Sequence, residues 1–140
     1  MNYKVCKKHH LKPAQEDPDK IISLIKVANA RLKAINQIKK DNETTSIIVE
    51  GYYETIKELL TALLLKHSLK SDNHECLISF FKTNYPKYEY EALTIHNLKD
   101  IRNRINYDGL FVKPEYLETN ELEFKHIIDL IKEICNNTPL

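Results

Sequence analysis

Residues 45–65 read TSIIVEGYYETIKELLTALLL and hold the longest apolar run of the 140-residue chain. Apolar side chains recur there at helical spacing, at Ile48, Tyr52, Thr55 or Ile56, Leu59 and Leu63. Leu60, Leu64 and Leu65 widen this stripe, which predicts a central helix with packing partners on two sides. Gly51 lies inside the helix, where glycine costs about 1 kcal/mol relative to alanine, and it indicates that another backbone comes close.

Two further helices flank the central one in the sequence. Asp17-Pro18 offers an N-cap followed by proline at the first helical position, and the helix that it opens should end near Lys39-Lys40. Thr44 or Thr45 is then expected to cap the central helix. Asp72-x-x-Glu75 has the spacing of a capping box and predicts a short third helix that ends before Pro86.

The last third of the chain predicts two more helices. One runs from about Glu89 to Asp108-Gly109, where the glycine suits a left-handed helix stop. The other begins at Pro114 or at the Asn120-x-x-Glu123 capping pair. Five helices with short connections predict an all-α, up-and-down bundle. We expect one helical domain over residues 17–140, preceded by a mobile or loosely docked basic arm over residues 1–16.

Composition excludes several classes of protein. Only 2 glycines argue against a turn-rich sandwich or barrel, and no apolar run is long enough to span a bilayer. The N-terminus lacks the apolar stretch of a signal peptide, so we expect a cytoplasmic protein. A net charge of +1 means that any nucleic-acid contact must come from a local patch.

The cysteines and histidines predict neither disulfides nor bound metal. Cys6, Cys76 and Cys135 are odd in number and far apart, which indicates reduced thiols. Cys6-x-x-His9-His10 resembles half of a zinc site, but no second ligand pair follows at the usual spacing. We therefore expect no metal site and no cofactor.

Residues 98–109, LKDIRNRINYDG, concentrate polar side chains at the end of a predicted helix. Arg102 should share a face with Asn106, whereas Arg104 points elsewhere. A guanidinium beside amide donors can bind a phosphate bidentately. Cationic side chains near a helix C-terminus also simply complement the helix dipole, so a surface role without a ligand stays open.

This segment resembles the R-x-x-A-D-Y-D end of the fourth helix in HEPN-domain proteins, a family of small helical bundles. The residues that match are Arg102, Ile105, Asn106, Tyr107 and Asp108. Residues 51–64 are similar to the tyrosine-led second helix of that family, and residues 70–78 to the segment that enters its third helix. The resemblance covers roughly residues 18–136.

The resemblance implies a homodimer in which two copies of the segment face a shared cleft that binds RNA or a nucleotide. Many HEPN proteins act in toxin–antitoxin or defence systems, often paired with a minimal nucleotidyltransferase, and many are metal-independent RNases. Transferred to this chain, the catalytic positions are Arg102, Asn103 and Tyr107, and the binding positions are Arg104, Asn106 and Asp108.

The chain departs from the family's RNase pattern in one respect. That pattern places a histidine shortly after the arginine, where this sequence has Tyr107, Asp108 and Gly109. None of these is an obvious base at neutral pH. We therefore expect a binding module, with a metal-independent RNase that uses Arg102 and a non-histidine base as the alternative. His96, earlier on the same helix, is a further candidate base.

Overall fold

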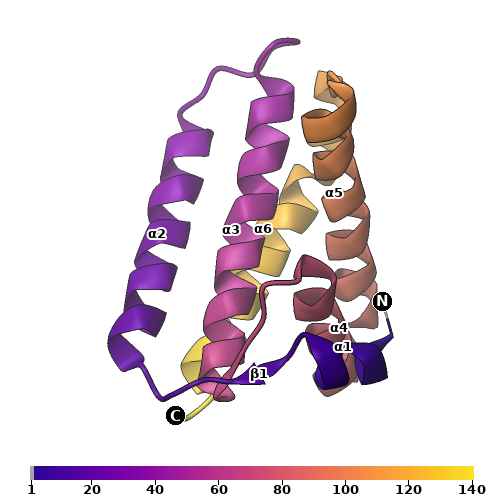
Figure 1. Cartoon of the computed structure of the whole chain (residues 1–140). Helices are drawn as coiled ribbons and strands as arrows, with labels where there is room; N and C mark the ends of the chain where they lie inside the picture. Colours follow the sequence, from indigo (N-terminus) through magenta and orange to yellow (C-terminus); the bar gives the residue numbers. More distant parts are fainter. Residues whose placement is uncertain (1) are drawn as a thin grey trace.

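The central helix is α3, Thr45–Lys66, in the computed structural model, which describes residues 2–140. Four helices surround it: α2 (Pro18–Asn36), α4 (His74–Asn84), α5 (Glu89–Asp108) and α6 (Pro114–Asn137). Most of its side chains are buried as a result. Figure 1 shows α2, α3 and α5 standing side by side with α6 behind them. The prediction of an all-α helical bundle is confirmed.

The predicted helix boundaries hold where capping chemistry is strong. The Asp17 carboxylate accepts a hydrogen bond from the backbone N–H of Lys20 at 3.1 Å, and Pro18 opens α2. Gly109 ends α5 with a φ of 66°, in the left-handed region that only glycine adopts cheaply. Of the two starts considered for the last helix, Pro114 is the one observed.

Two boundaries differ from the prediction by a few residues. Helix α4 is capped by Asn73, whose side chain accepts from the backbone N–H of Cys76 at 3.2 Å, and not by Asp72. Helix α2 ends at Asn36 instead of near Lys40, because the chain then turns around Asp41. The Asp41 carboxylate accepts from two backbone N–H groups in this turn, which lowers its pKa.

Gly51 provides room for the neighbouring helix. A Cβ atom built at this position would lie 2.5 Å from Cγ2 of Ile35 on α2, which is closer than real contacts allow. The neighbour is therefore a buried isoleucine side chain, and not the second backbone that the sequence suggested. This close packing fixes the C-terminal end of α2 against the N-terminal part of α3.

The segment predicted as a mobile or loosely docked arm packs on the bundle through regular secondary structure, so of the two alternatives its described residues 2–16 are docked. Residues Tyr3–His9 form a short helix, α1, which packs on α4. A short strand, β1 (Lys12–Pro13), then pairs antiparallel with β2 (Leu69–Lys70), so that Lys12 lies opposite Lys70. In Figure 1 this indigo segment crosses below α3 to reach α4.

A disulfide fastens this segment to the bundle. Cys6 and Cys76 are bonded with their Cα atoms 5.4 Å apart, so the prediction of reduced thiols is wrong for these two residues. The disulfide could not be predicted from the sequence, because the two cysteines are far apart in it and only the docking of α1 on α4 brings them together. Cys135 is free and buried, and burial raises the pKa of its thiol to about 11.

None of the helices in residues 2–140 is both long and apolar enough to cross a membrane. The remaining element is a 3-10 turn, η1 (Pro86–Tyr88), which leads from α4 into α5.

Reduction of the disulfide should destabilise the fold measurably. The bond closes a loop between residues that are 70 positions apart, for which chain entropy gives a stabilisation of about 4 kcal/mol. We expect urea unfolding in the presence of a reductant to show a free energy of unfolding lower by about 2–4 kcal/mol. A Cys6→Ser/Cys76→Ser double variant should show the same loss without reductant and no further response to it. Identical unfolding of the wild type with and without reductant would contradict the disulfide.

Candidate functional site

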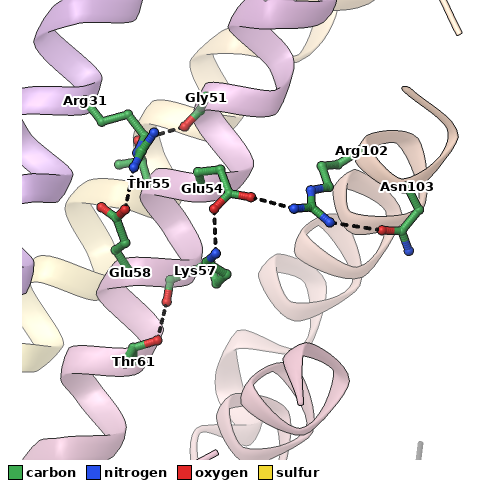
Figure 2. A network of polar contacts seen from close by, with 9 residues as sticks. All are labelled: Arg31, Gly51, Glu54, Thr55, Lys57, Glu58, Thr61, Arg102 and Asn103. Atoms are coloured by element: carbon green, nitrogen blue, oxygen red, sulfur yellow. Dashed lines mark hydrogen bonds and ion pairs between the residues drawn. The ribbon is translucent and has the colours of Figure 1, made fainter. Parts of the chain in front are cut away.

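Arg102 of α5 is held against α3 by an ion pair and an aromatic ring. Its Nη2 donates to Glu54 Oε1 at 3.0 Å, and the guanidinium carbon lies 5.7 Å from the centroid of the Tyr53 ring. Both partners come from successive positions of α3, whose helical turn presents them toward α5. Figure 2 shows the guanidinium reaching from α5 to the Glu54 carboxylate.

Asn103 and Asn106 make further hydrogen bonds with the Arg102 guanidinium. Asn106 Oδ1 accepts from Arg102 Nε at 3.2 Å, and Asn106 Nδ2 donates to Glu50 Oε2 at 2.9 Å, in the amide orientation that satisfies both groups. Arg102 Nη1 donates to Asn103 Oδ1 at 3.5 Å. The predicted shared face of Arg102 and Asn106 is confirmed. A guanidinium has five N–H donors, so these three partners leave donors for a further acceptor.

Glu54 carries two cations on one carboxylate. Lys57 Nζ lies 2.5 Å from its Oε2, while Arg102 occupies Oε1. Burial alone raises the pKa of Glu54, but Lys57 and Arg102 outweigh it, and the net pKa is lowered. The carboxylate is therefore ionised at neutral pH, and the pair of cations exceeds it by one charge.

A second group of paired charges, centred on Lys99, lies beside the ion pairs of Glu54. Lys99 is buried, and its Nζ donates to Glu75 at 2.9 Å, with Asp100 at 3.7 Å. The Lys99 ammonium also lowers the pKa of Glu75. These contacts tie α5 to the start of α4 and fix the spacing of the two helices.

An open pocket of about 390 Å³ lies between the start of α4 and the second half of α5. Its walls combine cations, carboxylates, amides and one aromatic ring. They are formed by Asp72, Asn73, His74, Glu75, Lys99, Arg102, Asn103 and Tyr107. The pocket is polar, and Arg102 forms part of its wall with 20% of its side chain exposed.

Three of the predicted site residues thus gather at this pocket: Arg102, Asn103 and Tyr107. Asn106 does not line the pocket, but its hydrogen bond with Arg102 Nε positions the guanidinium. Arg104 and Asp108 are exposed, and neither lines the pocket, so the structure does not bring these two predicted binding residues to it. Tyr107 is 80% exposed, which leaves its ring open to a partner.

His74 is the pocket residue that sequence reasoning missed. It is the first residue of α4, its ring centroid lies 6.1 Å from that of Tyr53, and it faces the same pocket as Arg102. Burial lowers the pKa of His74, and the charges of Lys57, Arg102 and Lys99 lower it further, against an opposing effect of Glu54. Its imidazole is therefore neutral at neutral pH and can accept a proton.

His96, the other candidate base, lies elsewhere. Its Nδ1 is 3.6 Å from an oxygen of Asp100, and it lines a groove of about 590 Å³ between α4 and α5 that shares Glu75, but not Arg102, with the first pocket. The signal that could have found His74 is its position directly after the N-cap Asn73, at a helix start that faces α5. Within residues 2–140 no three side chains of His, Cys, Asp or Glu gather closely enough to hold a metal ion.

Comparison with known proteins gives no relative. No protein-family model matches the chain, and neither the curated proteins nor the solved structures provide a match. The resemblance to HEPN domains therefore stays a prediction that depends on the residues quoted above.

Titration of His74 tests the electrostatics of the pocket. We expect NMR to give an imidazole pKa below 6.5 in the wild type, and a higher pKa in Arg102→Ala, because one repelling cation is removed. Arg104→Ala removes the same charge outside the pocket and should leave this pKa unchanged. The native state resists protonation of His74, so the stability linked to it is present above pH 6.5 and lost as pH falls through the lowered pKa. An equal His74 pKa in the wild type and in Arg102→Ala would contradict the electrostatic contact between the two side chains.

Proposed function

We propose that this chain is a module that binds RNA or a nucleotide through a phosphate contact at Arg102. One observation carries the proposal: a guanidinium is fixed in place by Glu54, Tyr53 and Asn106, and it still has free donors in an open pocket. Because the side chain is already ordered, binding an anion costs little further side-chain entropy.

The other pocket residues suit the same ligand. A guanidinium forms short, charge-assisted hydrogen bonds with phosphate oxygens. The exposed ring of Tyr107 offers a surface on which an unpaired base can stack, which is worth about 1–3 kcal/mol per base. Asn103 adds an amide beside the guanidinium. Phosphate, amide and ring contacts together favour a nucleotide over a simple anion.

The balance of charge in the pocket determines how the affinity for RNA should depend on salt. Glu75 and Asp72 line the pocket together with Lys99 and Arg102, so the pocket has no large excess of positive charge. The whole chain carries only +1. Affinity should therefore depend on the few cations that contact phosphates, and its dependence on salt should be modest, about −0.7 in the slope of log K against log salt concentration for each phosphate neutralised.

We further propose that the module is a homodimer with its two Arg102 pockets facing a shared cleft. Large apolar side chains are exposed close to the pocket, with Tyr107 at 80% and Phe111 at 70%, and on α6 Leu122 at 81%. Aromatic residues of this kind are enriched in protein interfaces. Pairing through the α5–α6 connection would bury them and double the positive charge around one cleft.

The resemblance to HEPN domains also motivates the biological setting in this proposal. It places the module in a toxin–antitoxin or defence system, with a minimal nucleotidyltransferase as partner. A reading frame for such an enzyme beside the gene, and its copurification with the chain, would support this setting.

A second function is favoured by His74. A neutral imidazole beside Arg102 can take the proton of an RNA 2′-hydroxyl, whose oxygen then attacks the adjacent phosphorus. The P–O5′ bond breaks, the departing 5′ oxygen takes a proton from water, and the products are a 2′,3′-cyclic phosphate and a 5′-hydroxyl end. Arg102 would stabilise the charge that develops on the phosphate oxygens. This route supplies the histidine that residues 107–109 lack.

RNA binding by Arg102 variants tests the first function. We expect Arg102→Ala to weaken binding of a labelled single-stranded RNA about 10- to 100-fold, because hydrogen bonds to charged groups contribute about 1.5–3 kcal/mol. Arg102→Lys keeps the charge but loses the planar fork, so it should recover only part of the affinity. Arg104→Ala is the matched control and should bind like the wild type.

The same incubation separates binding from cleavage. Intact RNA after incubation with the wild type supports a binding module. Cleavage that persists in EDTA and disappears in both Arg102→Ala and His74→Gln would establish the RNase instead. Equal affinity of wild type and Arg102→Ala, with both proteins folded by circular dichroism, would refute the Arg102 site.

Sedimentation measures the proposed dimer. We expect two copies per particle at micromolar concentration, and Phe111→Ser should shift the equilibrium toward single chains because it removes buried apolar area. Tyr90→Ser is the matched control, since Tyr90 is 66% exposed at the other end of α5. A wild type that sediments as a single chain would contradict the shared cleft.

A further inference from the structure

A second pocket, of about 310 Å³, lies where the N-terminal segment meets α3. Three lysines and a histidine face it, together with two hydroxyls, one leucine and a single acid. The lining residues are His10, Lys12, Lys20, Thr61, Leu65, Lys70, Ser71 and Asp72. We refer to it as the basic pocket, because its lysines outnumber its one carboxylate in a chain that is otherwise close to neutral.

The fold places these cations together against their mutual repulsion. The β1–β2 pairing sets Lys12 directly opposite Lys70, an arrangement of like charges that is unfavourable in a strand pair. Lys20 lies in the first turn of α2, at the end where the helix dipole is positive. An anion bound between the three lysines would relieve both unfavourable contacts.

The other residues that line the basic pocket are already hydrogen-bonded or apolar, so an anion would be bound mainly by the lysines. The Thr61 hydroxyl already donates to the carbonyl of Lys57 at 2.9 Å, as Figure 2 also shows. Ser71 Oγ accepts from the backbone N–H of Asn73 at 3.1 Å. Leu65 supplies an apolar wall. Flexible ammonium groups around a partly apolar pocket suit a phosphate group, for which lysine acts as a point charge.

The basic pocket adjoins the Arg102 pocket. Asp72, in the connection between α3 and α4, lines both of them. A ligand that occupies the Arg102 pocket and continues along the chain surface past Asp72 therefore enters the basic pocket. Asp72 places a negative charge at the point where the two pockets meet.

We propose that the basic pocket binds a backbone phosphate of the same RNA strand whose neighbouring nucleotide contacts Arg102. This inference rests on the proposed function, and it extends that function from one phosphate contact to a continuous path over the α3–α4 connection. The disulfide has a role in this path, because it holds the segment that carries His10 and Lys12.

The salt dependence of RNA binding tests the path. The ligand is a labelled single-stranded RNA of about 12 nucleotides, within the range that single-stranded binding sites cover. Each phosphate neutralised on a single strand contributes about −0.7 to the slope of log K against log salt concentration. We expect Lys12→Gln/Lys20→Gln/Lys70→Gln to lower the magnitude of this slope by about 0.7, the contribution of one phosphate, with weaker binding at low salt.

Two matched variants sharpen the measurement. Lys26→Gln/Lys33→Gln/Lys39→Gln removes the same charge from exposed lysines outside both pockets and should leave the slope close to that of the wild type. Asp72→Asn removes the acid between the pockets and should tighten binding, which no general loss of stability would do.

The outcomes separate this inference from the proposed function. If Arg102→Ala weakens binding while the basic-pocket variant keeps the wild-type slope, the path is refuted and the Arg102 site stands. If the basic-pocket variant loses slope while Arg102→Ala does not weaken binding, the basic pocket is upheld as a phosphate site and the Arg102 site fails. Equal effects of the two lysine triplets, or no binding of RNA by the wild type, would refute the basic pocket.

Discussion

Helix α3 is enclosed by four other helices, so each ionisable group on it needs a partner at the edge of the core. Glu58 meets Arg31 of α2 at 2.7 Å, and Glu54 meets Arg102 of α5 at 3.0 Å. Figure 2 shows these two ion pairs on opposite sides of α3. They set how the flanking helices are rotated about their axes. The pair with Arg102 differs in its surroundings, because it opens onto a polar pocket.

In the proposed function, this arrangement gives Arg102 a structural role and a binding role. An arginine fixed by a partly buried carboxylate, an aromatic ring and an amide is an anchor between helices, and the same contacts preorganise its remaining donors. The cost is that Glu54 already neutralises part of its charge. Lys57 offsets this by giving Glu54 a second cation. The charges around Arg102 are therefore close to balanced, and an anion would bind there through the directed hydrogen bonds of the guanidinium and not through an excess of positive charge.

The sequence predicted what depends on local pattern and missed what depends on distant contacts. Apolar periodicity identified α3, and proline and glycine placed the start of α2 and the end of α5, because these signals act within one or two turns. The Cys6–Cys76 bond and the pairing of Lys12 with Lys70 join distant segments, and no pattern along the chain encodes them. The same holds for the site. Arg102 and Asn103 were found as neighbours, whereas His74 comes from another helix.

The α3–α4 connection is where these distant contacts converge. Within residues 68–76 the chain pairs with the N-terminal segment, lines both pockets, caps α4 and reaches the disulfide. Ser68 has a positive φ of 58°, an uncommon conformation for a residue other than glycine, and its carbonyl accepts from the N–H of Ala14 at 2.9 Å. A tight turn fixed at both ends has little freedom to move. The two pockets are therefore held in a constant relation to each other, which is what the proposed binding of successive phosphates of one strand would require.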